Sequence, residues 1–158
     1  MVRSFRGEGT QKVDAKGRVS IPATFRAVLR DGDPSWTDGK PPEFVIVYGG
    51  EDRNFLECFT MDAVKDVDEK ITRMSRGSKA RRKLSKMFNG QSQTATVDDT
   101  GRIVLPAKLR NKIDIDGDAY FIAMGDTFEI WKPETYEASD EMPQGADIWM
   151  LLEEGEGQ

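Results

Sequence analysis

Histidine is absent from the 158-residue sequence, and Cys58 is its one cysteine. The lack of histidine excludes Ser–His–Asp and Cys–His catalysis and the usual histidine-based metal sites. A single cysteine excludes an intrachain disulfide and a cysteine-rich zinc site, and its apolar neighbours in FLECFTM indicate a small buried side chain. The carboxylates that an enzyme would then need are scattered rather than paired. The sequence therefore predicts no enzyme, no metal, no cofactor and no small-molecule substrate.

Long hydrophobic runs are also missing. No run approaches the roughly 18 apolar residues that span a bilayer, and the N-terminal MVRSFRGEGT has no apolar segment of the kind found in signal peptides. We therefore expect a cytoplasmic protein without a membrane partner. The apolar fraction of 37% makes a lean core for two half-domains of about 80 residues. Each half is expected to pack on the other half or on another copy.

The charges are strongly segregated, although the net charge is only −5. Residues 1–30 carry seven Lys/Arg and two acidic residues, and residues 70–90 carry eight Lys/Arg and none. Residues 114–158 carry one lysine and thirteen acidic residues. Because the local field rather than the total charge steers a partner, the basic segments leave an anionic partner open.

An internal repeat is the main structural signal. The stretch VDAKGRVSIPATFR (13–26) aligns without gaps with VDDTGRIVLPAKLR (97–110), and the hydrophobic runs FVIVYG (44–49) and YFIAMG (120–125) continue the match. Seven of the fourteen positions in the two windows are identical: Val13/Val97, Asp14/Asp98, Gly17/Gly101, Arg18/Arg102, Pro22/Pro106, Ala23/Ala107 and Arg26/Arg110.

Each copy is predicted to contain a strand, a tight turn, a second strand, a short helix, a two-stranded hairpin and a final helix. Gly17 and Gly101 tolerate the positive φ that such a turn needs. Pro22 and Pro106 suit the first turn of the short helix. The hydrophobic runs around YGGEDRN and MGDT predict the hairpins.

The repeats are joined and followed by other segments. Helices are predicted over 61–75 and 78–89, with Thr60 and Ser78 as N-caps. The tail contains an apolar patch, IWMLL, that could dock on the body or on a neighbouring subunit, and the final EEGEGQ is expected to be disordered. The predicted division is a first repeat at 5–60, connecting helices with a basic stretch at 61–90, a second repeat at 91–136 and an acidic tail at 137–158.

The repeated D-x-x-x-R turn has a physical rationale. An aspartate that opens a turn can accept hydrogen bonds from backbone N–H groups two or three residues later, which is the role expected of Asp14 and Asp98. The guanidinium of Arg18 or Arg102 can fold back on that carboxylate. Either the pair only staples the turn, or the rigid turn presents the arginine to a phosphate or a guanine edge. Lys16 is expected to be exposed within the first turn.

The duplicated motif, each copy followed by V/I-x-I/L-P-A-x-F/L-R and an apolar hairpin, resembles the MraZ family of bacterial transcriptional regulators. The similarity runs from about Phe5 to about Tyr136. It implies a mainly β fold with short helices, of the α+β class. Two tandem AbrB/SpoVT-like repeats would interleave as a swapped-hairpin β-barrel, an intrachain pseudo-dimer, with connecting helices in addition.

The resemblance also implies a function. Such a protein would bind short direct repeats in promoter DNA, including that of its own operon. It would repress division and cell-wall genes. It would act at the nucleoid as a ring-like homo-oligomer. The residues that match the family's motif, or lie near the first turn and could contact phosphates, are then the expected DNA-binding set: Arg18, Arg102, Lys16, Arg3, Arg6 and Lys12. Those expected to stabilise the turns are Asp14, Asp98, Gly17 and Gly101.

Two features leave alternatives open. The basic helix can present a solvated face, an intersubunit contact or a DNA contact through Lys79, Arg81, Arg82, Lys83 and Lys86. The chain also departs from the family pattern in its long loop 31–42 and in its acidic tail.

The alternative function is that of a ring-forming assembly protein that acts through protein–protein contacts.

Overall fold

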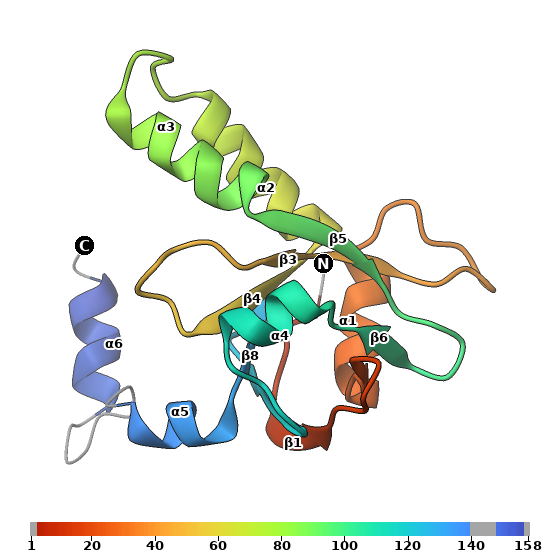
Figure 1. The fold of residues 1–158 in the computed structure, drawn as a ribbon. Coiled ribbons are helices and arrows are strands. Elements are labelled where there is room, and N and C mark those ends of the chain that lie inside the picture. Colours follow the sequence, from red (N-terminus) through yellow and green to blue (C-terminus); the bar gives the residue numbers. More distant parts are fainter. Residues whose placement is uncertain (1–2, 140–147, 157–158) are drawn as a thin grey trace.

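The structure is a computed structural model that describes residues 3–139 and 148–156 (Figure 1). The first half contributes β1 (Glu8–Lys12), β2 (Arg18–Ser20), α1 (Ala23–Asp31), β3 (Glu43–Val47) and β4 (Phe55–Thr60). The second half contributes β5 (Ser92–Thr96), β6 (Arg102–Val104), α4 (Ala107–Lys112), β7 (Asp118–Ala123) and β8 (Thr127–Trp131). Between them lie α2 (Met61–Thr72), α3 (Lys79–Ser85) and the π-helical turn η1 (Lys86–Gly90), and after them α5 (Pro133–Ala138) and α6 (Ile148–Glu156).

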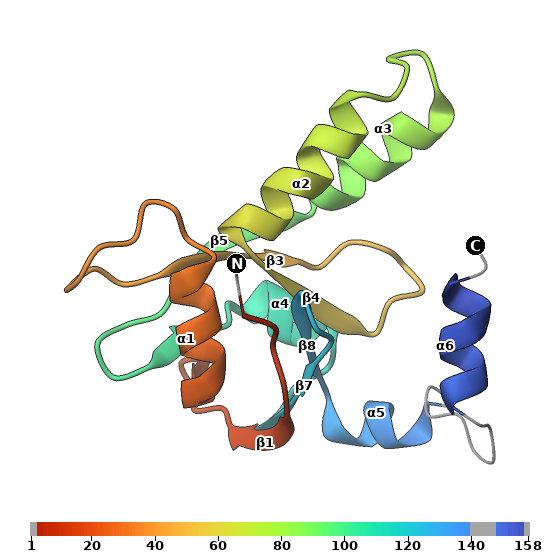
Figure 2. The ribbon, with the colours of Figure 1, turned by 180° about the vertical axis from the view of Figure 1, so that it is seen from behind.

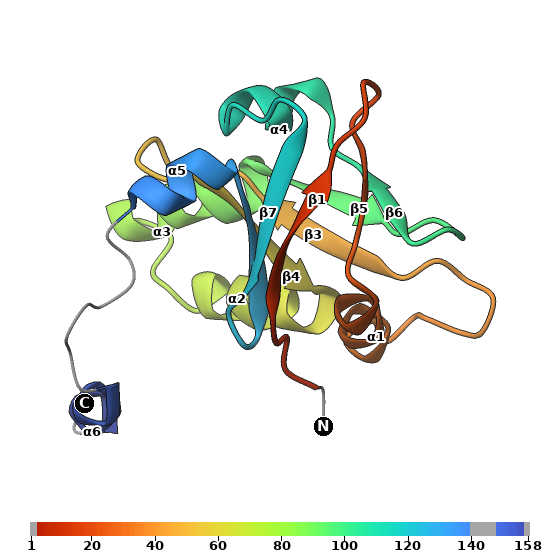
Figure 3. The same cartoon turned by 90° about the horizontal axis from the view of Figure 1, so that it is seen from below.

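The two halves interleave. A six-stranded antiparallel sheet has the order β1-β7-β8-β4-β3-β5, and β2 pairs with β6 in a separate two-stranded ribbon. The first strand of each half therefore pairs with the hairpin of the other half: β1 pairs with β7, and β5 pairs with β3. Figure 3 shows β1 beside β7. Exchanging the halves turns the strand order into its own reverse, as an approximate two-fold relation requires. The α+β class and the interleaving of the repeats are confirmed.

The six-stranded sheet does not close into the expected β-barrel through a continuous hydrogen-bonded ladder within residues 3–139 and 148–156. Among the described residues, β1 and β5 are its edges, and the bridge between Val13 and Val19 leads from the end of β1 into the ribbon. The ribbon and the helices α1 and α4 contribute their buried side chains to the same core as the sheet. Figure 2 shows α1 to the left of the sheet.

Both halves build one core. The ring of Phe128, from the second half, contacts three phenylalanine rings of the first half, at centroid distances of 5.1 Å to Phe5, 5.1 Å to Phe25 and 5.9 Å to Phe44. Cys58 is buried in this core, and burial raises the pKa of its thiol well above the usual value. Because the aromatic cluster spans the repeat boundary, neither half retains a complete core without the other.

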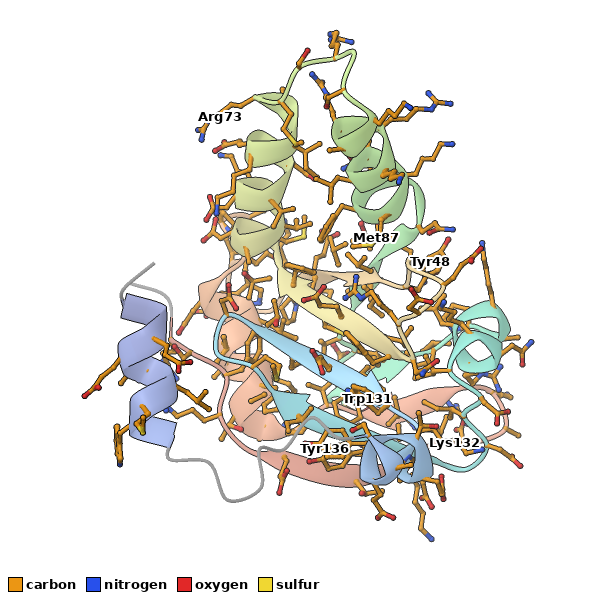
Figure 4. The ribbon with its side chains drawn as sticks, turned by 90° about the vertical axis from the view of Figure 1, so that its left-hand side faces the viewer. Tyr48, Arg73, Met87, Trp131, Lys132 and Tyr136 are labelled. Atoms are coloured by element: carbon orange, nitrogen blue, oxygen red, sulfur yellow. The ribbon has the colours of Figure 1, made fainter. Side chains whose placement is uncertain are left out.

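The helices α2 and α3 form a hairpin that projects from the sheet (Figures 1 and 2). The predicted caps are present: Oγ1 of Thr60 accepts a hydrogen bond from the backbone N–H of Ala63 at 3.0 Å, and Oγ of Ser78 accepts one from Arg81 at 3.0 Å. A second hydrophobic cluster joins the hairpin to β3 and β4. In Figure 4, Met87 lies at the base of the hairpin and Arg73 near its tip.

The helix expected after the second hairpin is present as α5, whereas the last segment of the chain differs from the expectation. The ring of Tyr136 in α5 packs against Tyr120 and Trp131, at centroid distances of 4.4 Å and 5.3 Å. The expected disorder of 153–158 is wrong for its first part, since α6 continues through Glu156; residues 157–158 lie outside the described residues. Within 3–139 and 148–156, none of the helices combines the length and apolar character that crossing a bilayer requires.

Candidate nucleic-acid interface

The first D-x-x-x-R turn is organised by Asp14. Its Oδ1 accepts hydrogen bonds from the backbone N–H groups of Lys16 at 3.0 Å and Arg18 at 2.9 Å, and its Oδ2 accepts one from Nε of Arg18 at 2.6 Å. Gly17 has a φ of +85°, which residues with a side chain rarely adopt. The direction of the Arg18 guanidinium is therefore held by the turn, while 40% of its side chain remains exposed.

The second turn repeats this arrangement with one difference. Oδ1 of Asp98 accepts hydrogen bonds from the backbone N–H groups of Thr100 and Arg102, both at 2.9 Å. The Thr100 hydroxyl donates to Asp98 at 2.8 Å and accepts from Nε of Arg102 at 2.9 Å. The direct ion pair between Arg102 and Asp98 is longer, at 3.6 Å. Thr100, where the first turn has Lys16, thus relays the contact between the aspartate and the arginine.

Each turn is packed against the opposite half. The carbonyl oxygen of Gly17 accepts a hydrogen bond from the backbone N–H of Leu105 at 2.8 Å, and that of Gly101 accepts one from Ile21 at 2.8 Å. A Cβ atom at Gly17 would lie 2.2 Å from the carbonyl oxygen of Leu105. A Cβ atom at Gly101 would lie 1.5 Å from Nη1 of Arg26. The glycines are therefore required for the approach of the two halves as well as for the turn.

The arginine that ends each repeated window supports the turn of the other half, a role that the sequence analysis missed. Nε of Arg110 donates to the carbonyl oxygen of Leu105 at 2.9 Å and would lie 3.0 Å from a Cβ atom at Gly17. Arg26 occupies the corresponding place beside Gly101. The signal was available, because this arginine is one of the identical positions of the repeat.

Strand pairing brings Arg18 and Arg102 onto one outward face. In the β2–β6 ribbon, Arg18 pairs with Val104 and Ser20 pairs with Arg102, while the middle residue of each strand is buried. The two arginines are diagonal neighbours, which lie about 7–8 Å apart in an antiparallel pair. Both line one hollow of about 620 Å³. Residues from opposite halves thus form a single surface, which we call the ribbon face: Arg18, Ser20, Arg102 and Val104.

The remaining predicted DNA-binding residues fall into two groups. Lys12 lines the same hollow, and Lys16 is exposed in the first turn. Arg3 lies elsewhere: Nε of Arg3 pairs with Asp31 at 2.9 Å, and Arg3 lines a different hollow beside α2. Arg6 is exposed between the Phe5–Gly125 bridge and β1. The structure therefore brings Lys12 and Lys16, but not Arg3, to the surroundings of the first turn.

The basic helix α3 lies on the projecting hairpin. Nη1 of Arg81 donates to the carbonyl oxygen of Met74 at 2.8 Å and so ties α3 to the end of α2. The other predicted basic residues of this segment are exposed: Lys79, Arg82, Lys83 and Lys86. The hairpin that carries them projects from the sheet (Figure 4).

The long loop of the first half lies beside the second turn. A hollow of about 450 Å³ is lined by Arg26, Arg30, Trp36 and Lys40 on one side and by Asp98 with its neighbours on the other. Nε1 of Trp36 donates to the carbonyl oxygen of Lys40 at 2.6 Å, which holds the loop together. The loop 31–42 thus adds one cationic side chain, Lys40, to the surroundings of the second turn, beside Arg26 and Arg30 of α1.

The chain was compared with known proteins. A family model described as "MraZ protein, putative antitoxin-like" matches residues 87–144. A protein of a Ruegeria species that bears the name transcriptional regulator MraZ is 57% identical, over 97% of each chain. The chain belongs to the MraZ family. Relatives with the same name in Ruegeria pomeroyi and Cereibacter sphaeroides are 54% and 43% identical, over 97% and 98% of each chain. The resemblance to MraZ that rested on the two motifs is confirmed.

The turn aspartates make the stability of this MraZ-family chain sensitive to acid. The pKa values of Asp14 and Asp98 are lowered from the usual 3.8, chiefly by the hydrogen bonds from the backbone N–H groups of Arg18 and Arg102. A lowered folded-state pKa contributes stability that is present above the unfolded pKa and is lost as pH falls through the folded one. The free energy of unfolding is therefore expected to decrease as the pH falls below about 4.

The variant Asp14→Asn/Asp98→Asn tests this expectation. Its free energy of unfolding, measured by urea titration with tryptophan fluorescence, should lie below that of the wild type at pH 7 and change less between pH 5 and pH 2. Asp38→Asn, on the exposed loop 31–42, is the control and should follow the wild-type profile. Equal acid sensitivity of the double variant and the wild type would show that the turn aspartates do not contribute.

Proposed function

We propose that this chain is a sequence-specific, DNA-binding transcriptional regulator without catalytic activity. The observation that carries the proposal is the placement of Arg18 and Arg102 on one outward face of a two-stranded ribbon. Two independent turns each hold one of these guanidinium groups in a defined direction. The name transcriptional regulator, borne by relatives that match nearly the whole chain, supports the same function.

The ribbon face suits the major groove. A two-stranded β-ribbon fits that groove, and arginine bound to O6 and N7 of guanine is the commonest specific contact there. The separation of about 7–8 Å between diagonal neighbours corresponds to about two steps of 3.4 Å along one DNA strand. Arg18 and Arg102 would therefore read guanines about two base pairs apart. Lys12 and Lys16 would contact phosphates, which position the protein without reading sequence.

A single copy is expected to bind weakly. The hollow that contains the arginines also contains the carboxylates of Asp14 and Asp118, and the net charge of the chain is −5. Several linked copies, each on one short direct repeat, would gain affinity through effective concentration. We therefore propose a ring-like homo-oligomer on promoter DNA at the nucleoid, with repeat units at 5–60 and 91–136, connecting helices at 61–90 and an acidic tail at 137–158.

The proposed targets are promoters of division and cell-wall genes, including that of the chain's own operon, and the proposed effect is repression. These targets rest on the membership in the MraZ family. The ribbon face accounts for DNA recognition as such, and the choice of promoter follows from the base sequence that it selects.

The projecting hairpin favours a second candidate function. It carries the exposed Lys79, Arg82, Lys83 and Lys86, and residues 114–158 are strongly acidic. A basic hairpin and an acidic tail on different copies are complementary, as an assembly protein would require. In that case the rings would form, but the ribbon face would have no specific DNA partner.

Binding to the chain's own upstream DNA separates the two functions. We expect specific binding by fluorescence anisotropy, and the logarithm of the association constant should fall linearly with the logarithm of the salt concentration. The expected slope is about −0.9 per phosphate neutralised. Size-exclusion chromatography of the same samples measures assembly. Rings that form without any preference for this DNA over an unrelated duplex would favour the assembly protein and contradict the regulator.

A further inference from the structure

The ribbon face contains an apolar side chain that the fold does not use. Val104 is 54% exposed, whereas its neighbours Ile103 and Leu105 are fully buried in the core. Strand geometry turns successive side chains to opposite faces, so the core residues on either side direct Val104 outward. The equivalent position in the first half is Ser20, which is also exposed. A polar residue is therefore compatible with this position, and valine is not required for stability.

This difference makes the two ends of the ribbon chemically unlike. Arg18 lies opposite Val104, and Arg102 lies opposite Ser20. Cross-strand partners have their Cβ atoms about 4.5–5.5 Å apart, which is between one and two base-pair steps. One arginine thus has an apolar neighbour and the other a hydroxyl, although the two halves are related by an approximate two-fold.

We propose that Val104 is a specificity-determining residue that contacts the 5-methyl group of a thymine beside the guanine read by Arg18. Ser20 provides a hydrogen-bonding group beside Arg102 instead. The proposal rests on the proposed function and deepens it, because it states which bases the ribbon face distinguishes. The 5-methyl of thymine is the apolar group that the major groove exposes, and serine accepts or donates to several bases.

The asymmetry has a consequence for orientation on DNA. A ribbon with identical ends would bind a site equally well in both directions. With valine at one end and serine at the other, one direction places Val104 on the thymine methyl and the opposite direction places Ser20 there. Each copy therefore binds its short DNA repeat in one preferred direction, which suits direct repeats, because these all have the same orientation.

The test begins with a duplex selected by the full chain from a random DNA library. Each thymine of that duplex is replaced in turn by deoxyuridine, which lacks only the 5-methyl group, and Kd is measured by fluorescence anisotropy. We expect one thymine beside a guanine at which the wild type loses about fourfold in affinity, the value of one buried methyl group. The variant Val104→Ser is expected to bind thymine and uracil there equally.

Two further variants complete the design. Ser20→Val/Val104→Ser exchanges the two residues, so that the opposite binding direction places valine on the same thymine methyl. The methyl dependence is therefore expected to persist at that thymine, with Arg102 instead of Arg18 reading the neighbouring guanine. Met124→Ser removes another exposed apolar side chain, 49% exposed in the hairpin between β7 and β8, and should leave the methyl dependence of the wild type unchanged. Thermal unfolding by circular dichroism checks that all three variants are folded.

The outcomes distinguish this proposal from the proposed function. If the wild type selects a sequence but binds thymine and uracil equally at every position, the role of Val104 is wrong and the regulator stands. A methyl dependence that persists in Val104→Ser also refutes it, because another residue then makes the contact. If the wild type selects no sequence at all, the proposed function itself fails.

Discussion

Alanine at both Arg18 and Arg102 is expected to abolish sequence-specific DNA binding and to leave the fold intact. The exposed fraction of the side chain is 40% for Arg18 and 39% for Arg102, so the substitution opens no cavity in the core. Exposed ion pairs such as Arg18–Asp14 contribute only about 0–1 kcal/mol to stability. A bidentate arginine–guanine contact contributes about 1–3 kcal/mol of discrimination. Two lost contacts correspond to roughly a 30- to 20,000-fold loss of specific affinity.

The measurement compares Kd for the selected duplex with Kd for an unrelated duplex, together with the thermal unfolding midpoint. Arg73→Ala is the matched control, since it removes the same charge near the tip of the hairpin (Figure 4) and should keep the discrimination. Arg18→Lys/Arg102→Lys keeps the charge but loses the planar fork of donors, so it should retain general DNA affinity and lose discrimination. Full discrimination in the double alanine variant would exclude the ribbon face as the reading surface.

Alanine at Gly17 is expected to lower the free energy of unfolding by about 2–5 kcal/mol. The left-handed conformation of a residue with a Cβ atom costs about 1–2 kcal/mol, and Gly17 has a φ of +85°. The added Cβ atom would lie 2.2 Å from the carbonyl oxygen of Leu105. Relieving such overpacking costs about 1–3 kcal/mol more. The clash is with the backbone of the other half, which cannot turn aside as a side chain can.

Two other glycines separate these contributions. Gly101 has a φ of +79° and faces the end of the flexible Arg26 side chain, and Gly39 has a φ of +87° with nothing within 4 Å of a Cβ atom. Urea denaturation should therefore rank the loss of stability as Gly17→Ala first, Gly101→Ala second and Gly39→Ala last. If Gly17→Ala cost no more than Gly39→Ala, the close packing of the first turn on the second half would be refuted.

The sequence by itself determined the local elements. Glycine with positive φ, proline at a helix start and a hydroxyl at an N-cap act over a few residues, so the turns, the short helices and the capped α2 and α3 were predictable. The repeat also revealed that two equivalent units exist. The tail was predicted less well: composition suggested disorder for 153–158, but α6 extends through Glu156.

The tertiary structure alone decided which residues share a surface. Arg18 and Arg102 become neighbours only because β2 pairs with β6 across the two halves, and the register of that pairing turns Val104 and Ser20 outward with them. A shift of one residue in either strand would have turned the two outward side chains of that strand onto the core face. Arg3 is close to Arg18 in the sequence but pairs with Asp31 instead. Pairing between distant strands depends on the complete core, and no local sequence signal encodes it.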